Sequence, residues 1–162
     1  MTKEEYNKAV DDYADNIFRF VVKHLKNVDA AKDVVQDTFA KVWERKENIS
    51  YEKVRSYLFT TAHHTLIDLI RKEKYTDDVD TIDRHMYQKP DSNADLQEIL
   101  HEALDQLPEI QKTVVLLRDY EGYAYDEIGE ITGLKESQVK VYIFRARKKL
   151  KDYLVSIEAV ID

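Results

Sequence analysis

Apolar side chains recur at three- and four-residue steps along most of the chain, a period that predicts α-helices rather than strands. In the first half the pattern predicts helices over residues 2–26, 30–46 and 51–73. Thr2 and Glu5 have the spacing of a capping box at the start of the first of these helices. Together the three helices carry enough inward-facing apolar residues to bury one small core.

A polar and acidic stretch interrupts this pattern over residues 75–95, where six acidic residues stand against two basic ones. Pro90 lies near its end. Such a segment lacks the apolar surface that it needs to fold alone. We therefore predict two domains, over residues 1–74 and 96–162, joined by an acidic linker over residues 75–95.

The residues after this linker predict four shorter helices. Pro108 suits the first helical position of the second one, and Gly122 suits its end. The whole chain has only three Gly and two Pro, which argues against a turn-rich β fold. The predicted fold class is all-α, with two small helical domains.

The run "YDEIGEITGLKESQVKVYIF" over residues 125–144 has the spacing of a helix-turn-helix. Gly129 supplies a small residue where the second element crosses closely, Gly133 a turn residue tolerant of positive φ, and Val139 an apolar residue that joins the two helices. The alternative is an ordinary helical hairpin with a solvated basic face. Glycine inside a helix costs about 0.5–1 kcal/mol relative to alanine, and a close crossing at Gly129 would offset that cost.

The charge distribution supports the same reading. The chain has a net charge of −7, yet the segment Ser137–Lys151 carries six basic residues and no acidic one. The second helix of a helix-turn-helix enters the DNA major groove, where Gln pairs with adenine and Arg with guanine. The candidate groove-facing residues are Gln138, Lys140, Val141, Tyr142, Arg145 and Lys149.

The third predicted helix offers a second candidate surface. Arg55, Phe59 and His63 stand four residues apart, outside the apolar stripe, so they predict an exposed basic and aromatic strip that can grip unstacked bases. The alternative is a solvated face with one stray aromatic residue. His64 and Asp68 could share a metal ion, but nothing nearby completes a ligand set, so we expect no metal site.

Other classes of protein find little support. With no Cys in the chain, there is neither a disulfide framework nor a Cys-ligated zinc site. No nucleophile–base constellation or Gly-rich phosphate loop stands out, so we expect no catalytic residues, no cofactor and no enzyme activity. The start "MTKEEYNK" has no apolar signal region, and no apolar run approaches the roughly 18 residues that span a bilayer. We expect a soluble cytoplasmic protein without direct membrane insertion.

Three segments together resemble a known family. "AKDVVQDTFAKVWE" (residues 31–44) and "VRSYLFTTAHHTLIDLIRKEK" (54–74) resemble region 2 of bacterial RNA polymerase sigma factors of the extracytoplasmic-function type, within the sigma-70 family. The segment 107–154 resembles region 4 of the same family. Order and spacing agree across nearly the whole chain. The resemblance implies a sigma factor that binds core RNA polymerase and directs promoter-specific transcription initiation.

The resemblance also implies how the work is divided. Region 2 would bind the clamp helices of the polymerase β′ subunit and capture the melted −10 element, whereas region 4 would read the −35 element and rest on the β flap. An anti-sigma factor would cover these surfaces. The implied polymerase-binding residues are Asp33, Gln36, Asp37 and Lys41. The implied −10 residues are Asn48, Tyr51, Arg55, Phe59, His63, His64 and Arg71.

Several positions depart from the family pattern. His63 and His64 stand where Arg and Asn are common, and Tyr57 stands where Trp is usual. Val141 and Tyr142 replace a common Ser-Arg pair, so the −35 sequence cannot be transferred from relatives. Two other functions remain open at this point: a stand-alone helix-turn-helix repressor, which would need a dimer to read two half-sites, and a helical module that docks an acidic protein.

Overall fold

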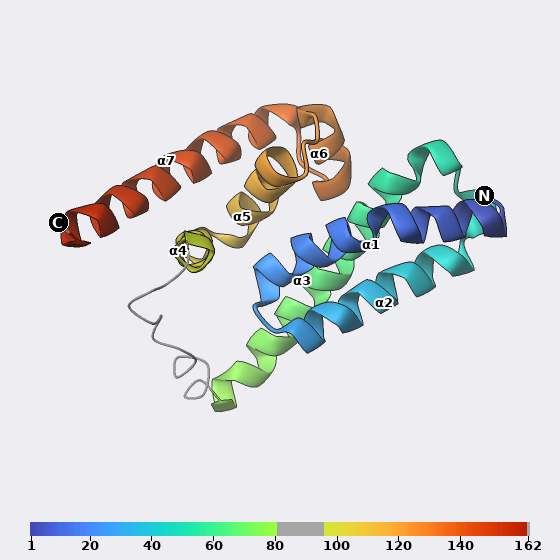
Figure 1. Cartoon of the computed structure of the whole chain (residues 1–162), viewed down its shortest axis with the longest axis horizontal. Helices are drawn as coiled ribbons and strands as arrows, with labels where there is room; N and C mark the ends of the chain where they lie inside the picture. The colour runs from blue at the N-terminus through green and yellow to red at the C-terminus, as the bar shows by residue number, and fades with distance from the viewer. Residues whose placement is uncertain (81–95, 162) are drawn as a thin grey trace.

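The structure is a computed structural model that describes residues 1–80 and 96–161, and within those ranges it is built of helices without strands (Figure 1). The long helices are α1 (Lys3–Leu25), α2 (Val28–Glu44), α3 (Val54–Asp80), α4 (Leu96–Asp105), α5 (Glu109–Val115), α6 (Tyr125–Thr132) and α7 (Glu136–Ile161). Short turns of helix are η1 (Lys46–Asn48), η2 (Tyr51–Lys53) and the π-helical η3 (Leu116–Tyr120). The predicted all-α class is confirmed.

The N-terminal unit consists of α1, α2 and α3, which pack against one another (Figure 1). Its core includes Ile17 and Phe20 from α1 and Leu58 from α3, all fully buried. The predicted capping box is present, because the Thr2 hydroxyl accepts from the Glu5 amide while the Glu5 carboxylate accepts from the Thr2 amide. These two bonds satisfy amides that the first turn of α1 would otherwise leave unpaired.

Helix boundaries depart from expectation at two places. The side chain of Asn27 caps α2 by accepting from the Ala30 amide, so this helix begins two residues before residue 30. Helix α3 continues to Asp80 instead of ending near residue 73, because no Gly or Pro stands there to stop a helix that is already formed. The rest of the predicted linker, residues 81–95, lies outside the described residues.

Trp43 lies at the surface rather than in the core. Its side chain is 41% exposed, and it packs edge-on against the Tyr6 ring with 4.9 Å between ring centroids. The Lys46 ammonium lies 4.3 Å from the centre of the Trp43 ring, within the range of a cation–π interaction. The C-terminal part of α2 therefore presents an aromatic side chain to solvent.

The C-terminal unit consists of α4, α5, α6 and α7, in which α6 and α7 form the predicted helix-turn-helix. Gly133 ends α6 with φ of +79°, the left-handed conformation that glycine tolerates best. Val139 is fully buried between the two helices. A Cβ atom on Gly129 would lie 2.9 Å from the Leu134 carbonyl oxygen, so the close approach involves the backbone of the turn.

The two units pack against each other. Contacts join α3 to α6 and α1 to α4, and the buried residues of both units form one continuous cluster. Figure 1 shows α6 beside the upper part of α1 and α3. This packing decides which face of each helix remains open to a partner.

Replacing Gly129 with Ala should lower the free energy of unfolding by about 1–2 kcal/mol. The added methyl group meets a backbone carbonyl that cannot move away, and overpacking of this kind costs about 1–3 kcal/mol, more than the 0.5–1 kcal/mol that alanine gains in a helix. Urea denaturation measures the change. Glu130→Ala, at the next and exposed position, is the control, and a Gly129→Ala variant as stable as the parent would contradict the close approach.

Candidate nucleic-acid interface

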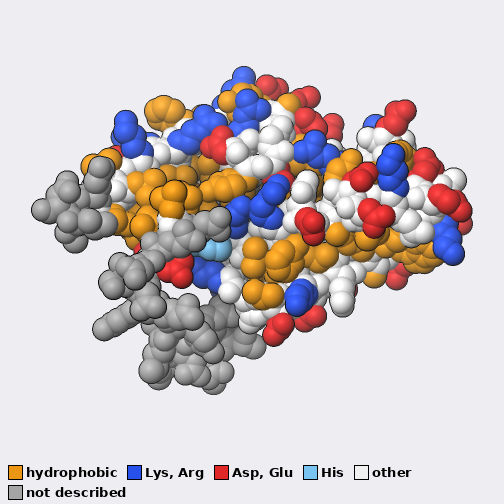
Figure 2. All heavy atoms as spheres, viewed as in Figure 1, with side chains coloured by type: hydrophobic (Ala, Val, Ile, Leu, Met, Phe, Trp, Pro, Cys, Tyr) orange, Lys and Arg blue, Asp and Glu red, His pale blue; other side chains and the backbone are white. Residues whose placement is uncertain are grey.

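Helix α7 turns one face inward and one face to solvent. Val139, Ile143 and Ala146 are buried against the rest of the unit. Five of the six predicted groove-facing residues are exposed on the other side: Gln138, Lys140, Val141, Arg145 and Lys149. Figure 2 shows Lys and Arg side chains along the outer edge of this helix. The helical period thus gathers the basic residues on a single open surface.

Tyr142 differs from the expectation for this face. It is half-buried and packs against the core cluster. The reason is its place one residue before the buried Ile143, at the border between the two faces. Only part of its side chain is therefore available to a partner.

Phe144 is a candidate that pattern analysis missed. Its side chain is 70% exposed, although an aromatic residue beside Ile143 is usually assigned to the core. The signal was its spacing, since it follows Val141 by three residues and precedes Arg145 by one. Val141 and Phe144 give the basic face an apolar centre that can contact thymine methyl groups.

Two side chains of α7, those of Arg147 and Gln138, make hydrogen bonds within the C-terminal unit. The Arg147 guanidinium donates two hydrogen bonds to the Asp119 carboxylate, at 3.0 and 2.6 Å, which ties α7 to η3. The Gln138 side-chain oxygen accepts from the Lys135 amide at the start of the helix. Arg145, by contrast, points out from the exposed face and suits a partner better than Arg147 does.

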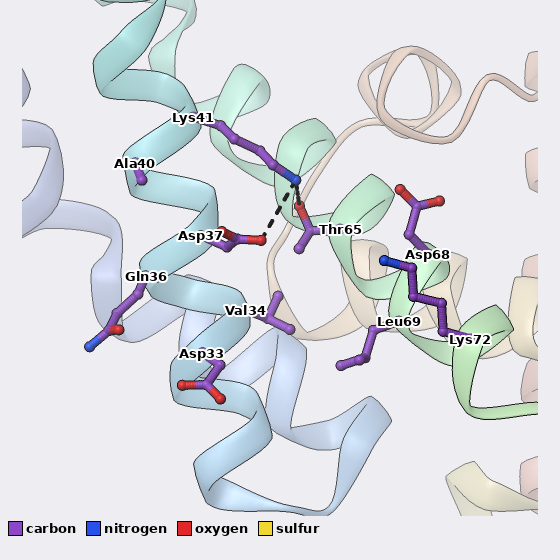
Figure 3. Close-up of a pocket in the computed structure, with 10 residues that line it drawn as sticks. All are labelled: Asp33, Val34, Gln36, Asp37, Ala40, Lys41, Thr65, Asp68, Leu69 and Lys72. Carbon is purple, nitrogen blue, oxygen red and sulfur yellow. Dashed lines mark hydrogen bonds and ion pairs between the residues drawn. The ribbon is translucent and has the colours of Figure 1, made fainter. Parts of the chain in front are cut away.

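A second candidate surface lies on α2 (Figure 3). The predicted polymerase-binding residues Asp33, Gln36, Asp37 and Lys41 are all exposed, and their spacing places them along one side of the helix. The Lys41 ammonium donates to the Thr65 hydroxyl at 3.0 Å and lies 3.8 Å from the Asp37 carboxylate. Figure 3 shows Asp37 and Lys41 directed toward α3 and Gln36 directed away from it.

These residues border a groove of about 620 Å³ between α2 and α3. The α3 side of the groove contributes Asp68, Leu69 and Lys72. Acidic, basic and apolar side chains alternate over a short distance there. Such a mixed, open groove favours the side of a protein helix over a small apolar ligand.

A third candidate surface is a hollow of about 380 Å³ where the end of α2 meets the middle of α3. Arg45, Tyr57, Thr61 and His64 line it, and the Arg45 guanidinium donates to the Tyr57 hydroxyl at 3.4 Å. The loop that contains the predicted residues Asn48, exposed, and Tyr51, half-buried, follows directly after Arg45. Arg45 and Thr61 were not among the predicted site residues.

The prediction that Arg55, Phe59 and His63 form an exposed strip on α3 is wrong. Phe59 is fully buried and His63 is only 6% exposed. The ring of Phe59 packs edge-on against Phe20 of α1, at 5.6 Å between centroids, and against Tyr123 of the C-terminal unit, at 5.1 Å. Both units cover this side of α3. The helix face that carries Phe59 and His63 therefore packs against protein instead of facing solvent.

The other members of the predicted −10 set divide between two sides of α3. His64 and Arg71 are exposed. Arg55 is half-buried, donates to the Glu121 carbonyl oxygen at 2.8 Å and lies 4.2 Å from the centre of the Tyr123 ring. His64 therefore belongs with the hollow beside Tyr57, whereas Arg55 belongs with the contact between the units.

Charged groups cross the boundary between the units. The Arg19 guanidinium donates to both carboxylate oxygens of Glu121, at 3.0 and 2.9 Å. Nδ1 of the buried His24 lies 2.7 Å from a Glu109 oxygen, and the Lys112 ammonium donates to the His24 carbonyl. Burial lowers the pKa of His24, against the opposing effect of Glu109.

The described residues contain no group of three or more His, Cys, Asp or Glu side chains that could hold a metal ion. His63 is buried whereas His64 is exposed, and their ring centroids are 6.0 Å apart. Within the described part of the chain, no helix is both long and apolar enough to cross a membrane. Among the described residues, the candidate surfaces are those of α7, of α2 and of the hollow beside Tyr57.

Two helical units, one of them carrying an exposed basic recognition helix, define a DNA-binding protein of the helix-turn-helix class. The chain matches the family model for sigma-70 region 2 over residues 9–76 and the model for sigma-70 region 4 over residues 97–150. It is 33% identical over 159 residues to RNA polymerase sigma factor SigV of Bacillus subtilis (strain 168), covering 93% of this chain and 95% of the relative. It is 27% identical over 144 residues to the ECF sigma factor SigM of the same organism, covering 86% and 88%.

Solved structures agree on the fold. The sigma factor RpoE, crystallised with the anti-sigma factor NepR from Bartonella quintana, superposes with a TM-score of 0.80 at 22% identity, covering 93% of this chain and 97% of that one. CnrH in complex with the cytosolic domain of CnrY gives a TM-score of 0.71 at 19% identity, covering 96% and 90%. The chain belongs to the sigma-70 family, in its extracytoplasmic-function group, and is a sigma factor that directs transcription initiation.

The free energy of unfolding should fall as the pH drops from about 6.5 toward 4. Burial lowers the pKa of His63 to about 4, with His24 and His64 adding to the effect and Glu109 opposing it. In the unfolded chain this histidine has an ordinary pKa near 6.5. Between pH 6.5 and 4 it is therefore protonated in the unfolded chain but neutral in the folded protein, so a lower pH favours unfolding. Between pH 7 and 5 His63 should contribute about 2 kcal/mol to this loss.

Urea denaturation at a series of pH values measures how the free energy of unfolding changes with pH. His63→Leu removes one buried titrating group and should reduce this pH dependence, with the part due to His24 remaining. His64→Leu, at the neighbouring exposed position, should leave the pH dependence unchanged. Equal slopes for the parent and both variants would show that His63 does not stay neutral in the folded protein.

Proposed function

We propose that the exposed face of α7 reads the −35 element of a promoter. The observation that supports this most is the exposed face of α7, where Arg145 and Lys149 lie beside Val141 and Phe144. The turn at Gly133 fixes the orientation of this helix. Arg145 would contact a guanine edge, since Arg pairs bidentately with guanine in the major groove. Lys149, one turn further on, would contact phosphate and hold the helix in register.

We propose the hollow beside Tyr57 and the loop before it as the site for the melted −10 element. His64, Arg45 and the Tyr57 ring combine hydrogen-bonding groups with an aromatic surface, the chemistry that holds an unstacked base. Asn48 and Tyr51 would act from the loop, and Arg71 further along α3 would contact phosphate. Phe59, His63 and Arg55 would contribute only in an arrangement of the two units in which their side of α3 is uncovered.

We propose that α2 binds core RNA polymerase through Asp33, Gln36, Asp37 and Lys41. These residues are exposed beside a groove that accepts the side of a helix, in keeping with the β′ clamp helices as the partner. The C-terminal unit would rest on the β flap. The protein would act in the cytoplasm, where it lends promoter recognition to the polymerase and carries out no covalent chemistry itself.

An anti-sigma factor is the proposed regulator. The related RpoE was crystallised with the anti-sigma factor NepR. A regulator of this kind would act by covering α2 or the −10 hollow, and would leave the protein unable to bind polymerase or DNA.

The function is tested by transcription in vitro. Purified protein, sigma-free bacterial core polymerase and a fragmented genomic library are combined, and the RNA start sites are mapped. Starts behind a shared pair of sequence motifs, present only when the protein is added, support the proposal. No such starts, with a control sigma factor active on the same core and the cognate polymerase also tried, would favour a repressor or a protein-binding module.

Arg145→Ala should weaken binding to a −35-containing duplex by about 10-fold or more and relax the preference at one base pair, because a bidentate Arg–guanine contact is worth about 1–3 kcal/mol. Arg147→Ala is the matched comparison. It removes the ion pair with Asp119 and should lower the stability of the C-terminal unit without changing base preference. Fluorescence anisotropy with a set of point-mutated duplexes distinguishes the two, and an Arg145→Ala variant with unaltered preference would refute the assignment.

Gln36→Ala should weaken the complex with core polymerase and leave duplex binding unchanged, because Gln36 lies on α2 far along the chain from the recognition helix and points away from α3 (Figure 3). Competition against a labelled sigma factor for core polymerase measures the loss. Asp12→Ala, an exposed change on α1, is the control. Equal competition by both variants would remove Gln36 from the polymerase surface.

A further inference from the structure

Three histidines lie around the boundary between the two units. His24 belongs to α1, His63 to α3 and His101 to α4, and each has one ring nitrogen that is buried and finds no hydrogen-bond partner among the described residues. We propose that these three residues, the histidine cluster, are a proton sensor. Mild acid charges them and separates the two units, while each unit keeps its own helices.

His24 is the most deeply buried member of the cluster. Its side chain is fully buried, and its Nδ1 lies 2.7 Å from Oε1 of Glu109 on α5. When Glu109 is ionised and the ring is neutral, Nδ1 donates this hydrogen bond and only a lone pair is left at Nε2. A proton on Nε2 would create a buried charge and a buried N–H group without an acceptor, and both are costly.

Ammonium groups beside His24 add to the cost of that proton. The buried Lys112 ammonium donates to the His24 carbonyl at 3.4 Å and to one oxygen of Asp105 at 3.1 Å. The Lys26 ammonium pairs with the other oxygen of Asp105. With a neutral His24 ring, the two ammonium groups are balanced by the carboxylates of Asp105 and Glu109. A protonated ring would place three positive groups against two negative ones.

The other two histidines are also held neutral by their surroundings. Nδ1 of His63 and Nε2 of His101 are the buried ring nitrogens without a partner. Burial lowers the pKa of His63, and the nearby His24 and His64 rings add to this effect. Burial is likewise the main cause that lowers the pKa of His101. Each of the three rings therefore resists a proton as long as the units stay packed.

Charged and titratable groups from four helices surround the cluster and its Glu109 partner. The acidic groups favour a proton on the histidines, whereas burial and the basic groups oppose it. Burial is the largest cause at all three histidines, so the balance leaves the rings neutral. The surrounding groups are Lys23 and Lys26 of α1, His64 and Lys74 of α3, Asp105 of α4, and Glu109 and Lys112 of α5.

Separation of the units changes the proton affinity of the cluster. It exposes the three rings to water, where histidine has an ordinary pKa near 6.5. The separated form then binds protons that the packed form does not bind, so separation becomes more favourable as the pH falls below about 6.5. Between pH 6.5 and 5.5 the ratio of separated to packed protein should rise about fivefold for each histidine, and on the order of 100-fold for the three together.

The surface that acid uncovers is the side of α3 that carries Arg55 and Phe59. In the packed protein the Tyr123 ring of the C-terminal unit covers both side chains, 4.2 Å from the Arg55 guanidinium and 5.1 Å from the Phe59 ring centre. Acid therefore gives α3 a basic and aromatic face that it lacks at neutral pH. Binding of nucleic acid to that face rests on the proposed function, whereas the separation by protons does not.

The sensor is tested on the full-length protein by a pH titration from about 7.5 to 5. NMR shifts of the imidazole rings report the protonation of each histidine. Because the chain has no Cys, dyes on Asp12→Cys of α1 and Lys151→Cys of α7, both exposed, report separation by energy transfer. His24, His63 and His101 should take up protons at one shared midpoint with a Hill coefficient of about 2 or more. Energy transfer should fall at the same pH, while the helical circular dichroism stays unchanged.

Substitutions assign the response to the cluster. His24→Gln keeps a donor for Glu109 but cannot be charged, and its combination with His63→Leu should reduce the change in the separated-to-packed ratio from on the order of 100-fold to about fivefold. His64→Gln, at an exposed position, should respond to pH as the parent does. Energy transfer in the parent that stays constant, or that falls only when the circular dichroism is lost, overturns the proposal. Equal responses of the parent and the double variant would show that other groups sense the acid.

Discussion

The ion pair between Arg19 and Glu121 is the interaction on which the arrangement of the molecule depends. A carboxylate that is almost fully buried must keep its partner, and in this protein the partner stands on the other side of the boundary between the two units. With Glu121 fixed, Tyr123 is brought under Arg55 and against Phe59, and α6 is brought against α3. This polar contact and the buried apolar cluster that spans both units together leave one side of α3 covered and the other side open.

That choice separates the candidate surfaces by accessibility. The α2 surface around Gln36 and the outer face of α7 are open to solvent, whereas Arg55 is bonded to the Glu121 carbonyl and covered by the Tyr123 ring. The proposed polymerase surface on α2 is therefore accessible while the two units are packed together. A partner that binds α2 first and then attracts the C-terminal unit to a second site would supply the free energy that separates Arg19 from Glu121, since a ligand shifts such an equilibrium only by its differential affinity for the two states.

Local features of the fold were predictable from sequence because they depend on near neighbours. The capping box at Thr2, the left-handed Gly133 and the buried Val139 all follow from residue type and short spacing. The surroundings of α3 were not predictable in this way. A four-residue spacing places Phe59 and His63 on one face, but whether that face meets solvent or another unit depends on a contact with Tyr123, more than 60 positions away along the chain. Phe144 was missed for the converse reason, since its apolar character gave no sign that its face would stay uncovered.

The modest strength of each DNA contact means that the two units must act together on a promoter. A recognition helix that neutralises about four phosphates binds with a salt dependence of only about −3.6 in log K against log salt, so neither unit holds a promoter well alone. Affinity comes from joining the two contacts through polymerase, where the second contact acts at a high effective concentration.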